Sequence, residues 1–357
     1  MREDRQVPLA PLTTMRVGGP ASRLVTAESA DELIETVRAA GQRVLVLSGG
    51  SNLLISDEGF DGTVARVASR GIDVDSADRC GGVIVTVAAG ESWDGFVTRA
   101  VEAGWAGVEA LSGIPGLVGA TPIQNVGAYG QEVGQTIRSV RVWDRQETAV
   151  RTIVSADCAF TYRNSRFKGT SRYVVLDVTF RLDIADYSRP IAYGDLAAAL
   201  GVELGARVPL ADARAAVLGQ RRRRGMVLDD GDHDTWSCGS FFTNPILSRA
   251  EFEELAARVR ARFGVDVVPP SYPAHGGPGE GSLKASAAWL IDRAGFAKGY
   301  GMPGPAALST KHALAVTNRG GATATDIVAL AREIRAGVVA AFGVTLTHEP
   351  VLVGLDL

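Results

Sequence analysis

Residues 113–130 read GIPGLVGATPIQNVGAYG, and the fold of the first half of the chain depends on this stretch. Its five glycines and two prolines weaken both helix and central strand, so the stretch predicts a loop. Apolar residues are interleaved with the glycines, which favours a loop that packs against the protein. Such a loop brings backbone N–H groups close to a neighbour. Two interpretations stay open, a tight structural turn and a phosphate-binding loop.

A second glycine turn, Ser48-Gly49-Gly50-Ser51-Asn52, follows a short buried strand predicted at 44–47. It is a second candidate for binding phosphate. Neither turn has the Gly-x-Gly-x-x-Gly pattern of a dinucleotide-binding βαβ unit, and no Walker A lysine follows. A doubly wound Rossmann fold is therefore not supported.

Composition limits the possible functions. The chain has 357 residues with a formal net charge of −3 and a pI of about 5.9, so neither nucleic acid nor an acidic membrane surface is expected as a partner. No apolar stretch is long enough to cross a bilayer, and the N-terminal MREDRQVPLAPL lacks the apolar segment of a secretory signal. Cys80, Cys158 and Cys238 form neither a disulfide framework nor a metal-binding spacing. We expect a cytoplasmic monomer with no bound metal.

Strands and helices are mixed along the chain, which predicts an α+β fold. Helix starts are predicted at Ser29, Ser92, Ser248 and either Thr323 or Thr325, and the first and third of these carry a capping-box glutamate. The remaining helices are expected at 196–200, 211–224 and 284–294. Alternating apolar residues predict strands at 62–89, 140–143, 150–154, 173–182 and 344–355.

Four residues stand out for chemistry, each with a plain structural alternative. Ser240 follows a glycine and precedes two phenylalanines, so it is either a proton donor or an ordinary turn serine. Arg163 beside aromatic residues suits binding of a carboxylate or phosphate, or makes a surface salt bridge. Glu349 is either exposed at a sheet edge or placed for function. Tyr193 lies in a loop ahead of a helix.

The chain as a whole resembles one family. The resemblance rests on motifs in a fixed order: TTMRVGG at 13–19, GGSN at 49–52, IPG at 114–116, PIQNVGAYG at 122–130, YR at 162–163, GSFF at 239–242, AWLID at 288–292, KHAL at 311–314 and EP at 349–350. From about residue 12 to residue 355, the chain resembles the UDP-N-acetylenolpyruvoylglucosamine reductases, flavoenzymes that make UDP-N-acetylmuramate for peptidoglycan.

The resemblance implies an FAD-binding fold of the vanillyl-alcohol oxidase (PCMH) type with a C-terminal α+β substrate-binding domain. The implied bounds are 1–70 and 71–225 for two FAD-binding subdomains and 226–343 for the substrate domain, with 344–357 returning to the first subdomain. FAD would be bound non-covalently, and NADPH would be the co-substrate. The implied FAD-binding residues are Gly49, Gly50, Ser51, Asn52, Leu53, Ile114, Pro115, Gly116, Gly119, Ala120, Thr121, Pro122, Gln124, Asn125, Gly127, Ala128 and Arg221.

The resemblance also implies roles in the reaction. Ser240 would protonate C2 of the enolpyruvyl group, while Arg163 and Glu349 would stabilise the enolate-like intermediate. The Tyr193 loop resembles the first type of this reductase. The implied substrate-binding residues are Tyr129, Tyr193, Arg224, Asn244 and Lys284.

The chain departs from the family pattern at four places near the substrate. Thr243 stands where a lysine is common, Arg224 replaces another lysine, His348 replaces the proline before Glu349, and Cys238 precedes the Gly-Ser step. These departures bear on how the substrate is bound. Two other functions stay open, an FAD-dependent sugar or alcohol oxidase of the same fold and a catalytically silent protein that binds a nucleotide sugar.

Overall fold

Residues 1–67 contain the strands of the first sheet and the helix that connects two of them. We describe a computed structural model of the chain, which covers residues 1–78, 80–274 and 279–357. Strands β1 (Arg2–Pro8), β2 (Pro20–Ala27), β5 (Phe60–Val67) and β3 (Val44–Leu47) form a sheet in that order, and β5 is parallel to both β2 and β3. Helix α1 (Ala30–Ala40) connects β2 to β3.

The predicted capping box of α1 is half right. The Ser29 hydroxyl accepts a hydrogen bond from the Glu32 N–H, as expected. The Glu32 carboxylate, however, accepts from the N–H of Glu28 at 2.8 Å and also pairs with the N-terminal amine. The Glu32 side chain therefore caps the N–H of Glu28, one residue earlier than in a capping box.

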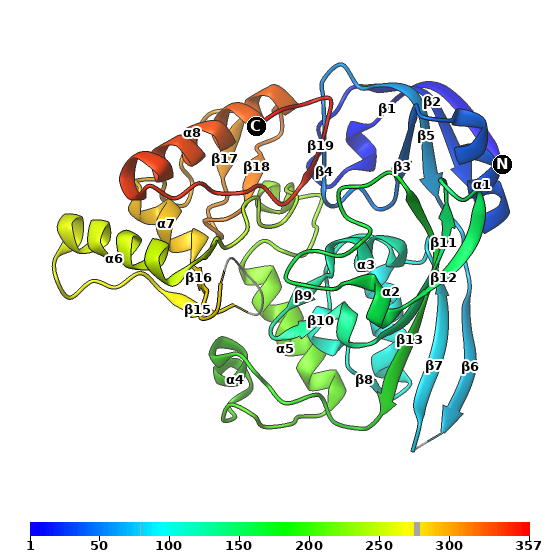
Figure 1. Ribbon diagram of the computed structural model, residues 1–357, viewed down its shortest axis with the longest axis horizontal. Coiled ribbons are helices and arrows are strands. Elements are labelled where there is room, and N and C mark those ends of the chain that lie inside the picture. The colour runs from blue at the N-terminus through cyan, green and yellow to red at the C-terminus, as the bar shows by residue number, and fades with distance from the viewer. Residues whose placement is uncertain (79, 275–278) are drawn as a thin grey trace. The chain divides into compact units, whose positions relative to one another are not determined.

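A larger antiparallel sheet follows (Figure 1), with the order β12 (Ala149–Val154), β11 (Ile137–Asp144), β13 (Tyr173–Ile184), β7 (Gly82–Ala88) and β6 (Ile72–Asp78). Short β8 (Trp105–Ala106) extends β13. Alternate residues of β7 are buried, as expected for a strand with one face on the core. Helix α2 (Trp93–Glu102) packs on that face, where Trp93, Phe96 and Phe180 form an aromatic cluster with ring centroids 4.9–6.1 Å apart.

The glycine-rich stretch contains more regular structure than we predicted. A short helix, α3 (Thr121–Gln124), lies inside it, and Pro122 occupies the first turn, where a missing N–H costs nothing. Asn125 ends this helix in the left-handed conformation (φ 44°), and β9 (Gly127–Ala128) then pairs with β10 (Gln131–Glu132). The expectation of a loop without helix is therefore wrong over these four residues. Helices α4 (Gly194–Leu200) and α5 (Leu210–Arg223) come next.

The C-terminal part is built from small sheets and three helices. The pairings are β4 (Leu53–Ile55) with β19 (Val351–Val353), β17 (Ala306–Leu308) with β18 (Val316–Asn318), and β16 (Leu283–Ala285) between β14 (Ile246–Leu247) and β15 (Ser271–Pro273). The helices are α6 (Arg249–Phe263), α7 (Ala287–Arg293) and α8 (Ala324–Phe342). One-turn 3₁₀ helices lie at Ala10–Leu12, Glu109–Leu111, Val118–Ala120, Val133–Gln135, Ser155–Cys158 and His233–Thr235.

Two boundaries in this part differ from the prediction. The helix expected at 284–294 begins only at Ala287, because the Ser286 hydroxyl caps it by accepting from the Trp289 N–H, and Lys284 instead lies on strand β16. The strand expected at 344–355 is reduced to Val351–Val353. Ahead of Pro350, His348 makes a single bridge to Phe242, so this part of the chain pairs with a loop rather than with a sheet.

The described residues group into two compact units. The first holds Met1–Val7, Ala21–Gly50 and Phe60–Val227, and the second holds Pro8–Pro20, Ser51–Gly59 and Leu228–Leu357. Each unit has its own apolar core. The α+β class is confirmed, whereas the three domain ranges drawn from the sequence stay predictions.

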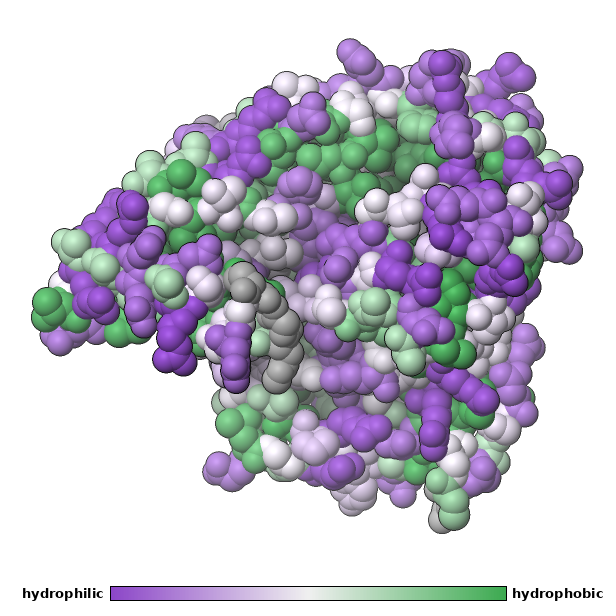
Figure 2. Space-filling model, viewed as in Figure 1, coloured by the Kyte–Doolittle hydropathy of each residue, from purple (hydrophilic) through white to green (hydrophobic). Residues whose placement is uncertain are grey.

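Polar side chains cover much of the face in Figure 2, with apolar residues gathered in smaller areas. In the described part of the chain, no helix has the length and apolar character that a membrane span requires.

Segment Ser51–Gly59 is tied to α8 within the second unit. The Asp57 carboxylate accepts hydrogen bonds from the N–H groups of Ala324 and Thr325 at 2.7 and 2.9 Å, and from the Thr325 hydroxyl at 2.8 Å. These N–H groups open the helix, where a carboxylate also interacts favourably with the helix dipole. An aspartate 267 residues away in sequence therefore adds to the Thr323 cap of α8.

We predict that Asp57→Ala lowers the free energy of unfolding by about 1 kcal/mol, because two N–H groups lose their acceptor. Urea denaturation followed by tryptophan fluorescence measures the change. Burial alone would raise the pKa of Asp57, but the hydrogen bonds from Ala324 and Thr325 outweigh it and lower the pKa. The stabilisation is thus present above the pKa of an unfolded aspartate and is lost as the pH falls through the lower folded pKa.

The matched control is Glu58→Ala, which removes the adjoining carboxylate without touching these hydrogen bonds. We expect it to change stability by less than about 0.5 kcal/mol. Equal losses in the two variants would show that Asp57 acts as a general surface charge and not as a cap.

Candidate functional site

The two glycine turns predicted to bind phosphate meet in the first unit. A Cβ atom placed on Gly49 would lie 2.5 Å from the Gly116 Cα atom, which is closer than real Cβ atoms approach. Gly119 is packed as tightly, since its Cβ would lie 2.5 Å from that of Ala89. Only glycine permits the backbone of residues 48–50 to touch the long loop.

The long loop is fixed by backbone hydrogen bonds at the junction of β7 and α2. The Gly116 C=O accepts from Trp93 N–H at 3.1 Å, and the N–H groups of Val118 and Gly119 donate to Glu91 and Ala89 at 2.9 Å. At its start, the Gly113 N–H donates to the Asp94 carboxylate at 2.6 Å. The loop is therefore held in a defined position.

Asn125 fixes the second half of the loop through its side chain. Its amide donates to the Thr161 C=O and to the Glu132 carboxylate, both at 2.9 Å, and its carbonyl accepts from the Gly134 N–H at 3.0 Å. These contacts connect the loop to the turn that carries Arg163. Asn125, predicted as a cofactor residue, is thus fully engaged in shaping the loop.

Three buried side-chain atoms around this loop have no hydrogen-bond partner among the described residues: Ser48 Oγ, Gln124 Nε2 and Arg221 Nε. A buried polar atom without a partner costs about 1–3 kcal/mol, so such atoms are rare in native proteins. A fourth such atom, Trp236 Nε1, lies in the second unit. The three atoms near the long loop are typical of a site that a polar ligand completes.

Positive charge gathers at the same place. The pKa of Arg221 is lowered to about 10, mainly by burial; the charges of Tyr129 and Asp94 oppose this shift, and those of Arg163 and Arg224 add to it. Burial raises the pKa of Tyr129, against the effect of Arg224 and Arg221. Three arginines and a tyrosine therefore share one electrostatic environment, which suits an anionic ligand.

Arg163 sits on a strained turn, with φ of 53°. Its Nη2 donates to the Gly127 C=O at 2.6 Å, and its guanidinium lies 5.2 Å from the centre of the Tyr162 ring. A Cβ on Gly127 would lie 2.9 Å from the Arg163 Nη1, so the first glycine of the PIQNVGAYG motif makes room for the guanidinium.

Tyr129 and Tyr193 lie together. Their ring centres are 6.0 Å apart in an edge-to-face arrangement, and 52% of the Tyr193 side chain is exposed. Arg224, at the end of α5, pairs with Asp195 at 2.5 Å just beyond Tyr193. Tyr129 and its neighbours also line a cavity of about 400 Å³ beside α4 and α5.

The structure also places Ser240 and Glu349 side by side along the backbone, within the second unit. The Glu349 N–H donates to the Phe241 C=O at 2.8 Å, one residue after Ser240. Asn52 donates to the Glu349 C=O at 3.4 Å. Phe241 and Phe242 are buried, so they hold this segment on the core while Ser240 and Glu349 stay partly exposed.

Cys238, next to this pair, is held unreactive. Its thiol donates to the Leu53 C=O at 3.3 Å, and burial, followed by the charge of Glu349, raises its pKa to about 12. A thiol with so high a pKa carries almost no thiolate at neutral pH. The cysteine ahead of the Gly-Ser step is therefore a packing residue.

The two substrate residues expected in the second unit lie on adjoining segments. Lys284 on β16 pairs with Ile246 on β14, two residues after Asn244. The Asn244 side-chain carbonyl accepts from the Ala287 N–H at 2.9 Å, at the start of α7. Asn244 therefore has a structural bond besides its predicted role.

The predicted site residues thus divide between the units. The first holds Gly49, Gly50, Arg221, Arg163, Tyr129, Tyr193, Arg224 and the residues predicted from Ile114 to Ala128, and the second holds Ser51, Asn52, Leu53, Ser240, Asn244, Lys284 and Glu349.

Sequence reasoning missed two carboxylates that support the first unit's site. Asp94 anchors Gly113 and pairs with Arg214 at 2.7 Å. Glu109 is 1% exposed and accepts from Gly107 N–H, Gln131 Nε2 and Arg189 N–H at 2.6–2.9 Å. Asp94 follows the Ser92 cap, so a sequence signal existed for its helix position, though none for its contact with Gly113. Nothing in the local sequence marks Glu109.

Comparison with known proteins gives a consistent result. Residues 231–353 match a family model described as the C-terminal domain of UDP-N-acetylenolpyruvoylglucosamine reductase, and residues 21–153 match one described as an FAD binding domain. A UDP-N-acetylenolpyruvoylglucosamine reductase of Streptomyces avermitilis is 58% identical over 362 residues, covering 100% of this chain and 96% of that protein. One of Thermobifida fusca is 56% identical, covering 99% and 98%.

A solved structure agrees with these matches. The crystal structure of a UDP-N-acetylenolpyruvylglucosamine reductase from Thermus caldophilus aligns with a TM-score of 0.66 and 26% identity over 99% of each chain. The expected FAD-binding fold with a C-terminal domain of this reductase is confirmed. On identity along its full length, this chain belongs to the UDP-N-acetylenolpyruvoylglucosamine reductase family.

Proposed function

We propose that this chain reduces UDP-N-acetylenolpyruvoylglucosamine to UDP-N-acetylmuramate, using NADPH and non-covalently bound FAD, in the synthesis of peptidoglycan precursor. Family membership supports the reaction. The observation that carries the proposal is the backbone pairing of Phe241 with Glu349, because it keeps a hydroxyl and a carboxylate on adjacent segments of a buried aromatic support. A cytoplasmic monomer remains our prediction for its state in the cell.

The residues of the first unit fit FAD. The glycine contact leaves no Cβ between residues 48–50 and the long loop, as a closely held diphosphate requires. Ser48, Gln124 and Arg221 have buried polar atoms without protein partners, and Arg221 carries the charge that a diphosphate needs. FAD would be held by these groups and by the other predicted loop residues from Ile114 to Ala128.

Bound FAD would supply the hydride, taken from NADPH and delivered to C3 of the enolpyruvyl group. Addition at C3 shifts negative charge toward C2 and the substrate carboxylate. Arg163, a planar and permanently charged group, stabilises that charge, and Glu349 assists on the same side. Ser240 donates the proton to C2, a general-acid step that contributes roughly 10²- to 10⁴-fold.

The remaining predicted residues bind the nucleotide sugar. Tyr193 closes over it as in the first type of this reductase, next to Tyr129, and Arg224 contacts the substrate diphosphate after exchanging Asp195 for phosphate. Asn244 and Lys284 also bind the substrate. Because Thr243 stands where the family commonly has a lysine, one positive charge near the substrate is missing. We therefore assign more of the phosphate binding to Arg224.

We predict that Gly49→Ala abolishes flavin binding, because its new Cβ would lie 2.5 Å from Gly116 Cα and force the two turns apart. The visible absorbance of the protein after purification under native conditions measures bound flavin. The unaltered chain should be yellow and should bleach with NADPH.

Gly321→Ala is the matched control, because a Cβ there meets nothing within 4 Å. We expect it to purify with a full complement of flavin. A yellow Gly49→Ala protein would place the cofactor elsewhere, and a colourless unaltered chain would overturn the whole proposal.

We predict that Ser240→Ala leaves flavin reduction by NADPH unchanged and slows reoxidation by the enolpyruvyl substrate at least about 100-fold, since only the second step needs the proton. Stopped-flow absorbance measures each half-reaction. The first half-reaction is the internal control for folding. Equal loss in both steps would refute the proton-donor role, and fast reoxidation by oxygen alone would favour an oxidase.

A further inference from the structure

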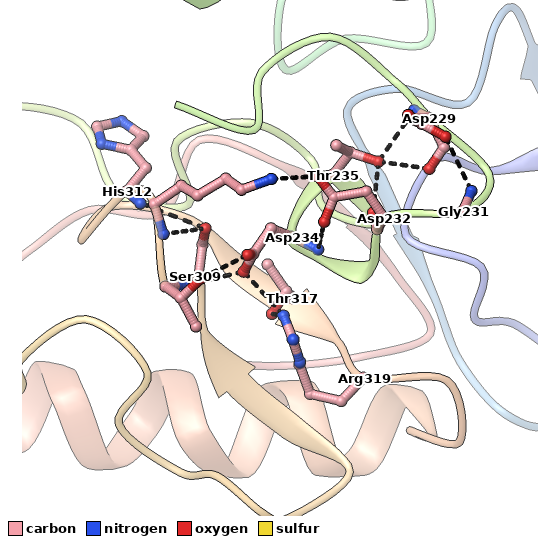
Figure 3. Close-up of polar contacts among 11 residues, drawn as sticks. Asp229, Gly231, Asp232, Asp234, Thr235, Ser309, His312, Thr317 and Arg319 are labelled. Carbon is pink, nitrogen blue, oxygen red and sulfur yellow. Dashed lines mark hydrogen bonds and ion pairs between the residues drawn. The ribbon is translucent and has the colours of Figure 1, made fainter. Parts of the chain in front are cut away.

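An aspartate outside the predicted site organises the loop that faces Phe241. Asp234 lies in the 3₁₀ turn His233–Thr235 (Figure 3). It is 5% exposed. Its carboxylate accepts from the Thr310 N–H at 2.8 Å, from the Thr310 hydroxyl at 2.5 Å and from Arg319 Nη1 at 2.8 Å. Burial alone would raise the pKa of Asp234, but hydrogen bonds from Thr310, Ser309 and Arg319 lower it, so the carboxylate stays charged.

The segment 309–315 between β17 and β18 is held from two sides. The Ser309 hydroxyl accepts from the N–H groups of Lys311 and His312 at 3.0 and 3.2 Å, which folds the segment on itself. Lys311 also forms an ion pair with Asp232, whose carboxylate in turn caps the Asp234 N–H at 3.0 Å. Figure 3 shows this network running from Asp229 to Arg319.

The fixed segment presents a carbonyl to the residue after Ser240. The Leu314 C=O accepts from the Phe241 N–H at 2.7 Å, and the Phe241 C=O accepts from the Glu349 N–H at 2.8 Å. The backbone of Phe241 is therefore hydrogen-bonded on both sides, through its N–H to the 309–315 segment and through its C=O to Glu349. We expect the position of Ser240, the preceding residue, to depend on both of these hydrogen bonds.

We propose that Asp234 is a positioning residue for Ser240, acting through Thr310, the 309–315 segment and the Leu314–Phe241 hydrogen bond. The proposal rests on the proton-donor role proposed for Ser240. In this proposal Asp234 acts through its protein contacts alone. Its effect follows from geometry, because a displacement of a catalytic group by about 1 Å costs up to about 100-fold in rate.

The test compares Asp234→Asn, Ser240→Ala and the double variant in both half-reactions by stopped flow. We expect Asp234→Asn to leave reduction by NADPH unchanged and to slow reoxidation by the enolpyruvyl substrate about 10- to 100-fold. The double variant should reoxidise at the rate of Ser240→Ala alone, because Asp234 acts only through Ser240. The proposal would be overturned if the two substitutions slowed reoxidation independently, so that their effects multiplied in the double variant. It would also be overturned if Asp234→Asn left reoxidation unchanged.

A readout independent of activity is hydrogen–deuterium exchange of the Phe241 amide. We expect faster exchange in Asp234→Asn, because the acceptor at Leu314 is released. The matched control is Asp144→Asn, which removes a carboxylate of similar burial from Arg172, away from the 309–315 segment. It should leave both Phe241 exchange and reoxidation unchanged. Similar changes in the two variants would reduce Asp234 to general stability and refute the proposal.

If Asp234→Asn does not fold, Thr310→Val replaces it in both measurements. It removes one hydroxyl donor to Asp234 and keeps the Thr310 N–H bond, so we expect the same pattern with a smaller rate loss. Unchanged exchange and reoxidation in this variant would count against the proposal. If Ser240→Ala itself reoxidises normally, the proton-donor role fails, while the exchange of the Phe241 amide still tests the link from Asp234.

Discussion

The close approach of Gly49 to Gly116 is the constraint on which the first unit depends. Two backbones meet with no space for a Cβ, so the end of β3 and the long loop must be delivered to the same point. The sheet fixes the end of β3. The junction between β7 and α2 fixes the long loop, through hydrogen bonds of Glu91 and Trp93 to Val118 and Gly116. The buried aromatic cluster of α2 and β13 then holds that junction rigid.

The second unit solves a similar problem by pairing loops that are far apart in sequence. The chain enters it at Pro8, again at Ser51 and finally at Leu228. Strand β4, which follows Ser51, pairs with β19, the strand that follows Glu349. The TTMRVGG motif contributes here as well. Thr14 donates to the Ser237 C=O at 2.7 Å, and Asn318 donates to the Met15 C=O at 3.1 Å. The motif therefore braces the segment that leads to Ser240.

What could be predicted from the sequence was local. Ser92, Ser248 and Thr323 cap the helices at the expected positions, and strand β3 has the predicted ends, because these signals are carried by neighbouring residues. Lys284 was misplaced because the capping residue Ser286 lies inside an apolar run that reads as one helix. The contacts of Asp57 with α8 and of Asp234 with Thr310 join residues 267 and 76 positions apart. No short-range pattern encodes such pairs.

Hydrogen-bond satisfaction separates the supporting groups from the ligand-binding groups. Glu109 and Asp234 are buried carboxylates whose oxygens accept several protein hydrogen bonds, so they stabilise the fold around a site and have little capacity left for a ligand. Ser48, Gln124 and Arg221 each keep a buried polar atom without a protein partner. Folding alone does not repay that cost, whereas the diphosphate of the proposed FAD would, because it would bring acceptors to these buried groups. Buried carboxylates that are saturated with protein hydrogen bonds therefore differ from the buried polar atoms near the long loop, which keep capacity for the ligand that we propose.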